Sequence, residues 1–135
     1  MSVEPEHRSA AMGGLPAWDK ELALERAGGD ATRAARYLEM LLGTFCEVRE
    51  GLSTGVREGR WPDIQRRLHT LAGASLYCAA TALHGAARRA EAMIKEDRLV
   101  DAEPLVCCVL EEMARLEAAA GEGDEAAQRD QGVDS

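Results

Sequence analysis

The chain has 135 residues, enough for one domain with a real core but not for two. Its five aromatic residues are few, whereas Ala, Leu, Glu and Arg are plentiful, and this composition favours helices over sheets. The net charge of −8 argues against nucleic acid as a partner, and no apolar run approaches the roughly 20 residues of a membrane span. The first residues lack a basic region followed by an apolar one, so we expect no signal peptide and a cytoplasmic protein without membrane contact.

The N-terminal third of the chain predicts a short helix and then a long one. Residues 1–14 have no periodic apolar pattern and are predicted to be disordered. A short helix is expected from about Trp18 to Ala27, ended by the pair Gly28–Gly29, and Asp30 is the expected N-cap of a long second helix. The apolar stripe of the long helix alternates steps of four and three residues and comprises Ala34, Leu38, Leu41, Phe45, Val48 and Leu52.

Three further amphipathic helices are predicted after Gly59, which ends the second helix. Pro62 suits the first turn of the third helix. The apolar side of that helix comprises Ile64, Leu68, Leu71, Ser75 and Cys78. The segment AATALHG is expected to bend or interrupt the chain, and the fourth helix carries Leu83, Ala87, Ala90 and Ile94. The last helix carries Ala102, Val106, Val109, Met113 and Leu116, with Asp101 as its expected N-cap and Val100 packed on Leu105 as a hydrophobic staple.

Four long amphipathic helices joined by short loops predict an all-α fold. We expect an antiparallel up-down four-helix bundle with a short additional N-terminal helix that acts as a lid. The bundle is predicted to span residues 15–119, and residues 120–135 to form a disordered acidic tail because they are polar and have almost nothing to bury. The sequence contains no dimerisation helix of the coiled-coil type, so we expect a monomer.

Cysteine spacing and local charge narrow the classes of ligand and partner that the chain could bind. The four cysteines show no metal-ligand spacing, and adjacent Cys107 and Cys108 point to different sides of a helix, so we interpret all four as small apolar fillers of a reduced protein. Residues 57–98 carry eight basic and five acidic side chains, a local net charge of +3 on an acidic chain. This basic segment favours an acidic protein partner or a phosphate as ligand.

The third helix contains a histidine, His69, in its middle. At about 100° per residue, His69 projects to the side opposite the apolar stripe. The residues predicted to share its face are Pro62, Gln65, Arg66, Ala72, Gly73 and Leu76. Gly73 costs roughly 1 kcal/mol relative to alanine inside a helix, so something other than helix stability favours it. We infer an exposed imidazole in a shallow notch that a bulky partner can reach; the alternative is a surface histidine without a role.

The stretch HTLAGASLYCAATAL, residues 69–83, carries a resemblance to a known family. It is similar to the signature of histidine-containing phosphotransfer (HPt) domains, and most closely resembles the HPt module of hybrid sensor kinases of the BarA/GacS type. In that family the histidine is followed by lysine at +3, glycine at +4 and often glycine at +10. His69 and Gly73 match this signature, whereas Ala72 replaces the lysine and Ala79 the later glycine.

The missing lysine raises the question of which cation supports the phosphoryl group. The resemblance implies that the family's lysine has this role. Arg66, one turn before the histidine on the same face, could supply the charge here, and Arg88 or Arg89 on the next helix are further candidates. His84 is interpreted as a solvated or capping side chain near the end of the bundle.

The resemblance implies a phosphoryl carrier of a two-component phosphorelay. His69 would accept phosphate from the aspartyl phosphate of a receiver domain and pass it to another receiver, and the supporting and docking residues would be Gln65, Arg66, Ala72, Gly73 and Leu76. It implies no cofactor on this chain, because Mg²⁺ would come with the receiver, and no autokinase activity, in agreement with the lack of a nucleotide-binding motif. Two alternatives stay open: a decoy or scaffold that binds receivers without transferring phosphate, and a plain helical interaction domain whose histidine is incidental.

Overall fold

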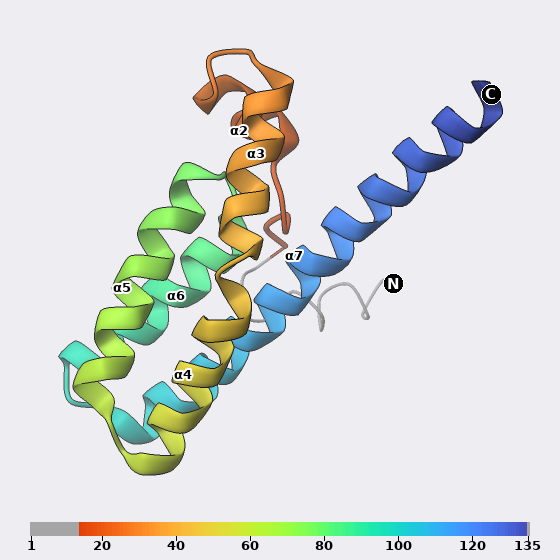
Figure 1. The fold of residues 1–135 in the computed structure, drawn as a ribbon. Helices are drawn as coiled ribbons and strands as arrows, with labels where there is room; N and C mark the ends of the chain where they lie inside the picture. The colour runs from red at the N-terminus through yellow and green to blue at the C-terminus, as the bar shows by residue number, and fades with distance from the viewer. Residues whose placement is uncertain (1–13, 135) are drawn as a thin grey trace, which may run out of the picture.

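The computed structural model describes residues 14–134, with side chains for residues 14–121. Within that range the elements are α2 (Lys20–Arg26), α3 (Ala31–Leu42), α4 (Phe45–Glu58), α5 (Trp61–Tyr77), α6 (Thr81–Lys95) and α7 (Leu99–Asp134). Helices α3 and α4 follow one another in the same direction, and α5, α6 and α7 then alternate in direction (Figure 1). The predicted all-α bundle with a short additional N-terminal helix is confirmed. None of the described helices is both long and apolar enough to cross a membrane.

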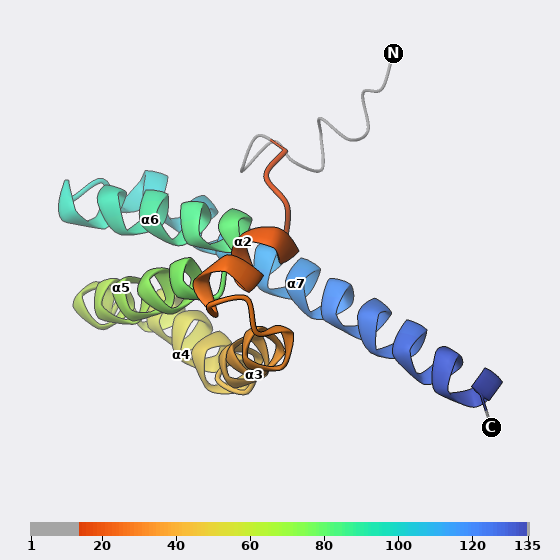
Figure 2. The same cartoon turned by 90° about the horizontal axis from the view of Figure 1, so that it is seen from above.

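The core of the bundle lies along the apolar stripes read from the sequence. Helix α6 makes the most extensive contacts, with α5 on one side and α7 on the other, and α5 and α6 lie side by side in the view from above (Figure 2). Every stripe residue is buried except Val48, which is half-buried. The largest fully buried side chains are Phe45, Leu52, Ile64, Leu68, Leu83, Met113 and Leu116. Because each such side chain contributes about 1.5–3 kcal/mol on burial, this seam is the main source of stability.

The predicted long second helix is two helices, α3 and α4, which corrects the sequence-based expectation. The interruption falls at Gly43 and Thr44. The Thr44 hydroxyl donates to the Leu41 carbonyl at 2.7 Å, and the Thr44 backbone N–H donates to the same carbonyl at 3.0 Å. A side chain that bonds its own helix in this way competes with the regular backbone ladder and bends the chain. The apolar stripe continues through the bend, since Leu41 and Phe45 are both buried.

The start of α7 also differs from the prediction. The helix begins at Leu99, so Asp101 lies inside its first turn and pairs with Arg98 at 2.8 Å instead of capping the helix. Val100 is 88% exposed, so the hydrophobic staple onto Leu105 is wrong. Leu99 packs against the core in its place, because the helix begins at Leu99, three residues before the expected first helical residue, Ala102.

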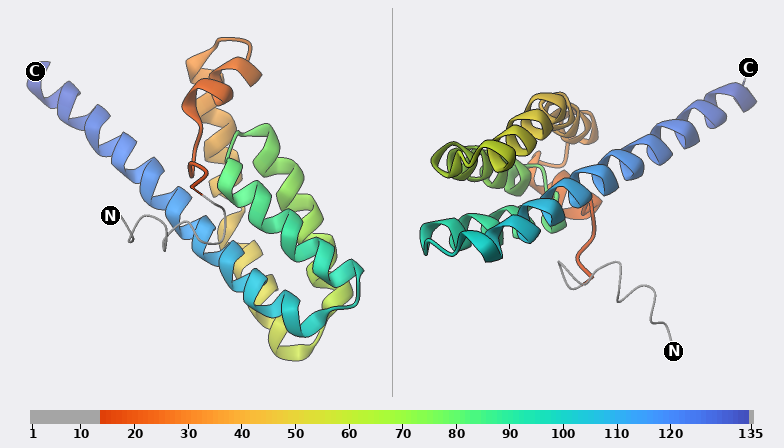
Figure 3. Two further views of the ribbon diagram at one scale, coloured as in Figure 1. Left: turned by 180° about the vertical axis from the view of Figure 1, so that it is seen from behind. Right: turned by 90° about the horizontal axis from the view of Figure 1, so that it is seen from below.

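The end of α7 differs from the expected disordered tail, because the helix continues to Asp134. Its last part extends away from the other helices (Figure 3). Half of residues 120–135 are Ala, Glu, Gln or Arg, which are strong helix formers and favour continuation of the helical backbone. The predicted disorder of residues 1–14 falls outside the described residues except for Gly14, which forms a turn.

The short helix α2 and the residues before it act as the predicted lid on one end of the bundle. They cover the carboxyl end of α5, where helix carbonyls lack partners within the helix. The Trp18 indole N–H donates to the Cys78 carbonyl at 3.0 Å, the Asp19 N–H donates to the Ala79 carbonyl at 2.9 Å, and the Arg26 guanidinium donates to the Leu76 carbonyl. The lid therefore fixes the end of the helix that carries His69.

Ala79 takes a left-handed conformation, with φ of 63°, at the end of α5. The Ala80 N–H donates to the Ser75 carbonyl and the Ala79 N–H to the Leu76 carbonyl, which is the Schellman pattern that glycine usually serves. Ala79 is fully buried against Ala23, Ala27 and Ala34, and this packing offsets the strain of its methyl group. Ala79 stands where the HPt signature often has glycine, and it adopts the left-handed conformation that glycine favours.

Substitutions at Ala79 should separate these two contributions to stability. Ala79→Gly relieves roughly 1 kcal/mol of strain but loses about 0.8 kcal/mol of methyl burial, so the free energy of unfolding should change by less than about 1 kcal/mol. Ala79→Val places a β-branched side chain in a left-handed conformation and adds volume to a packed site. It should lower the free energy of unfolding by about 2–3 kcal/mol. Urea unfolding followed by circular dichroism measures both; a valine variant as stable as the parent would contradict the assignment.

The four cysteines are free thiols, and only Cys78 fits the interpretation as a small apolar filler of the core fully. Cys78 is buried, its Sγ donates to the Tyr37 carbonyl at 3.3 Å, and burial raises the pKa of its thiol. Cys108 is half-buried. Cys46 and Cys107 are exposed, so they do not fill the core, because their helices turn these positions toward solvent.

Candidate functional site

His69 lies in the middle of α5 on the side that faces away from the core. Its side chain is 74% exposed, whereas its neighbours Leu68 and Leu71 are buried. The structure therefore places the imidazole on the open surface of a rigid helix, as the helical spacing predicts. A side chain carried by a regular helix is held more precisely than one carried by a loop.

A buried carboxylate from α6 holds the His69 ring. Glu91 Oε2 lies 2.9 Å from His69 Nδ1, and the Glu91 side chain is only 5% exposed. A carboxylate oxygen accepts hydrogen bonds, so this contact suits the tautomer of His69 that carries its proton on Nδ1. The other ring nitrogen, Nε2, then carries the lone pair of a neutral imidazole. The arrangement makes Nε2 a nucleophile at the exposed edge of the ring.

Lys95 shares the same carboxylate. Its Nζ lies 3.3 Å from Glu91 Oε2, one helical turn along α6 from Glu91. The His69 ring and the Lys95 ammonium group therefore meet at one buried carboxylate oxygen. Lys95 is itself 57% exposed, so its ammonium group stays accessible to a ligand.

A shallow hollow lies beside His69 on the amino-terminal side of the ring. It has a volume of about 450 Å³ and is lined by Pro62, Gln65, Arg66, His69, Thr70 and Lys95. Of the predicted supporting residues, Gln65 and Arg66 thus come together with the histidine. The hollow brings two cations and two neutral polar side chains to the edge of the imidazole, a composition suited to an anion.

Asp63 organises the basic residues of α5. Its carboxylate pairs with the Arg66 guanidinium and, at 2.8 Å, with Arg67 Nε. The hydrogen bond from Arg67 is the main cause that holds the pKa of Asp63 below its usual range; desolvation opposes it, and the hydrogen bond from Arg66 lowers the pKa further. Arg67 in turn lies across Gly51 of α4, where an added Cβ would come within 2.6 Å of its guanidinium atoms. Arg66 is therefore held on the His69 face, whereas Arg67 packs toward α4.

The surface on the carboxyl-terminal side of His69 is apolar and open. Gly73 is exposed, and a Cβ built on it would meet nothing within 4 Å. Leu76 and Tyr77, which follow it, are 45% and 53% exposed. Packing inside the chain therefore gives no reason for a glycine at this position.

An apolar groove continues this surface toward α3. Its lining residues are Tyr37, Met40, Leu41, Thr44, Ala74, Tyr77 and Cys78, around a volume of about 310 Å³. The rings of Tyr37 and Tyr77 pack with their centroids 4.9 Å apart, and a hydrogen bond with Tyr37 raises the pKa of Tyr77. Met40 at the rim is 66% exposed.

Two sequence-based placements are wrong. Ala72 was expected on the exposed face with His69, but it is only 2% exposed, because α6 packs over that side of α5. His84 was expected to be solvated or to cap a helix; instead it is half-buried and its Nδ1 donates to the Ala72 carbonyl at 2.8 Å. Ala72 thus belongs to the α5–α6 interface, and a docking role for its side chain is not retained.

Glu91 and Lys95 are the site residues that the sequence analysis missed. One signal was present: Glu91 follows Ala90 and lies four residues after Ala87, so it interrupts the apolar side of the fourth helix. A charge in a buried stripe requires a partner, and the antiparallel packing of α5 and α6 brings His69 there. The second cation at the hollow is therefore Lys95, in place of Arg88 or Arg89.

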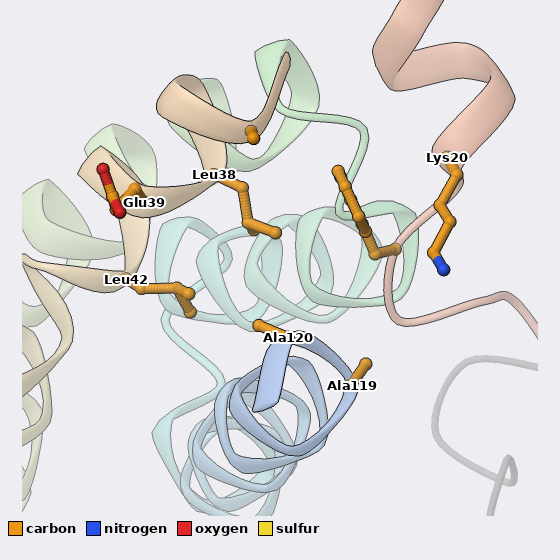
Figure 4. A pocket seen from close by; sticks show the side chains of 8 residues that line it. Lys20, Leu38, Glu39, Leu42, Ala119 and Ala120 are labelled. Atoms are coloured by element: carbon orange, nitrogen blue, oxygen red, sulfur yellow. The ribbon is translucent and has the colours of Figure 1, made fainter. Parts of the chain in front are cut away.

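Another hollow lies apart from His69, between α3, α7 and the start of α2 with the residue Trp18 before it. Figure 4 shows Leu38 and Leu42 pointing toward Ala120, with Lys20 and Glu39 at the two sides of the opening. The space measures about 270 Å³ and is bounded by Trp18, over whose ring Lys20 Nζ lies at 5.9 Å. It has no chemistry-bearing cluster comparable to that at His69.

Comparison with known proteins agrees with this geometry. A family model described as the Hpt domain matches residues 36–119, which include His69, Gly73, Glu91 and Lys95. The chain belongs to the Hpt domain family. Hpt domains are phosphotransfer carriers rather than autokinases and interact with receiver domains in phosphorelays. Family membership thus supports a role in histidine phosphotransfer.

Two curated relatives of this Hpt domain are sensor kinases. It is 34% identical over 79 residues to the sensor protein GacS of Pseudomonas syringae pv. syringae, a match that covers 58% of this chain and 9% of the relative. It is 31% identical over 83 residues to the sensor histidine kinase GacS of Pseudomonas protegens, covering 62% of this chain and 9% of the relative. The chain thus spans about 9% of the length of these relatives. No solved structure matched the chain.

Proposed function

We propose that the chain accepts a phosphoryl group on Nε2 of His69 from the aspartyl phosphate of a receiver domain and passes it to the aspartate of another receiver. One observation carries this proposal: the buried carboxylate of Glu91 lies 2.9 Å from Nδ1 of an otherwise exposed His69 ring, a contact that suits a proton on Nδ1 and a lone pair on Nε2. A decoy that only binds receivers has no need of a buried charge placed behind its histidine. We further propose that the exchange takes place in the cytoplasm and that this chain acts as a monomer.

The proposed step balances on groups that the two proteins supply. The Nε2 lone pair forms a bond to phosphorus, the bond from phosphorus to the aspartyl oxygen breaks, and the aspartate leaves as a carboxylate with that electron pair. Mg²⁺ would be carried by the receiver. Such transfers pass through a loose transition state, so alignment and charge stabilisation supply most of the catalysis.

Glu91 has a second role once the phosphoryl group is attached. A ring with a proton on Nδ1 and phosphorus on Nε2 carries a positive charge, and the buried carboxylate lies 2.9 Å from that proton. Charges interact more strongly at a partly buried site than in water, so Glu91 stabilises the cationic phosphoimidazole. The ring then remains a good leaving group for transfer to the second receiver.

The docking surface proposed for the receiver comprises Gly73, Leu76, Tyr77 and Met40. These residues are exposed, three of them are large and apolar, and they lie beside His69 on α5 and across the groove on α3. A receiver that covered this apolar surface would bring its acidic phosphorylation site over the basic residues next to the imidazole. Complementary charge would then fix the orientation of the complex.

Transfer of label from a receiver tests this function. A panel of purified receiver domains is phosphorylated with radiolabelled acetyl phosphate and Mg²⁺, freed of the donor, and mixed with the chain. We expect at least one receiver to lose its label to the chain within minutes, in a bond that is stable to alkali and labile to acid. Label that never reaches the chain, or that is stable to acid, would overturn the proposal.

Substitution of Glu91 tests its role as a positioning residue. A hydrogen bond to a charged group contributes about 1.5–3 kcal/mol, so Glu91→Ala should slow single-turnover transfer roughly tenfold to hundredfold. Glu91→Gln keeps an acceptor without the charge and should lie between that variant and the parent. The ¹⁵N chemical shifts of the His69 ring report which nitrogen is protonated. Unchanged shifts together with an unchanged rate would contradict the role.

A further inference from the structure

The hollow on the amino-terminal side of His69 has a composition that the docking surface lacks. Gln65 and Arg66 reach it from α5 and Lys95 from α6, with Pro62 and Thr70 completing the lining. No carboxylate is among its lining residues; Asp63 and Glu91 lie behind the cations and pair with them. Guanidinium, ammonium and amide donors thus surround an open space next to the ring, which is the donor set that binds phosphoryl oxygens.

Both cations are held in place without being buried. Arg66 is anchored by Asp63 while its side chain remains 68% exposed. Lys95 is anchored by Glu91, on the oxygen that also accepts from His69. Each anchor restrains the cation near the ring, so little ordering is required when an anion arrives. Both cations are themselves more than half exposed, so each can also reach a dianionic phosphoryl group that enters the hollow.

Lys95 is linked to the reacting ring through Glu91. Its ammonium group and the Nδ1 proton of His69 share Oε2 of that carboxylate, at 3.3 Å and 2.9 Å. Position 72, by contrast, is 2% exposed under α6, where His84 donates to its carbonyl. A cation that supports this histidine therefore has to come from a neighbouring position, and α6 supplies it.

The geometry points to this hollow as the phosphoryl-binding site of His69, in which Lys95 and Arg66 together hold the phosphoryl oxygens on Nε2. The inference rests on the proposed function and names its anion-binding residues. It gives the site two distinct sides: a basic hollow toward the start of α5 for the phosphoryl group, and an apolar surface toward its end for the partner protein. Lys95 supplies here the charge that Ala72 cannot.

Loading with phosphoramidate tests the hollow without any receiver. In this reaction the Nε2 lone pair forms the bond to phosphorus, the phosphorus–nitrogen bond of phosphoramidate breaks, and ammonia leaves with that electron pair. Two rates are measured at low ionic strength: that of phosphohistidine formation and that of its hydrolysis after the donor is removed. We expect Lys95→Gln and Arg66→Gln each to slow loading about threefold to tenfold, and the double variant to slow it further.

Two matched variants make the result specific. Lys95→Arg keeps the charge and should restore most of the loading rate. Arg98→Gln removes one exposed charge three residues further along the chain, outside the hollow, and should load like the parent. Normal loading and hydrolysis in Lys95→Gln, an equal loss in Arg98→Gln, or a parent chain that phosphoramidate does not load would each overturn the inference. Failure of every receiver to transfer label, with the loading pattern intact, would instead contradict the proposed function alone.

Discussion

His69→Gln should abolish phosphoryl acceptance, lowering the label transferred from a receiver by more than about a thousandfold. An amide nitrogen has no lone pair available for attack on phosphorus, whereas Nε2 of the imidazole does. Because the side chain is 74% exposed, the variant should unfold within a few degrees of the parent. The measurement is retention of acid-labile label together with thermal unfolding followed by circular dichroism.

His84→Gln is the matched control for this result. His84 is the other histidine among the described residues, on the helix next to His69, and its Nδ1 donates to the Ala72 carbonyl. Glutamine can replace that donor, so acceptance of label should persist. Label in His69→Gln, or its loss in both variants, would favour the interpretation in which the histidine at position 69 is incidental.

Much of the fold followed from the sequence because helical burial is periodic. The steps of four and three residues identified the buried side of every long helix, and Gly59 and Pro62 identified the turn before α5. The break at Thr44 could not be predicted, because the stripe runs through it without a change of phase. A side chain that bonds its own backbone leaves no trace in apolar spacing.

The site was predictable in part for the same reason. A helical wheel places His69 and Gly73 on the outer face, but it treats α5 as an isolated cylinder. Neighbouring helices cover more than the centre of the stripe, so Ala72, at its edge, is buried by α6. Likewise, the contact between His69 and Glu91 joins residues 22 apart, and only the register of α5 against α6 determines it.

Gly73 is where stability and function are expected to respond in opposite directions. Gly73→Ala should raise the free energy of unfolding by about 0.5–1 kcal/mol, because alanine is the better helix former and its Cβ meets nothing within 4 Å. Gly73→Glu should slow transfer from a receiver about a hundredfold, corresponding to about 3 kcal/mol of lost docking energy, because it puts bulk and negative charge one turn from His69. A glycine that served only the stability of α5 would not show these opposite effects on stability and on transfer.

Three comparisons isolate the cause of that loss. Gly73→Gln adds the same bulk without charge and should also slow receiver transfer, while phosphoramidate, a donor of few atoms, should still load both variants. Gly121→Glu places the same change at another exposed helical glycine with open space around it, on α7, and should leave transfer intact. If Gly73→Glu accepts phosphate from the receiver at the parent's rate, or if Gly121→Glu is slowed equally, the partner does not approach over Gly73. If phosphoramidate loading falls as far as receiver transfer does, the substitution acts on the imidazole itself and the glycine is part of the reacting site instead of the docking surface.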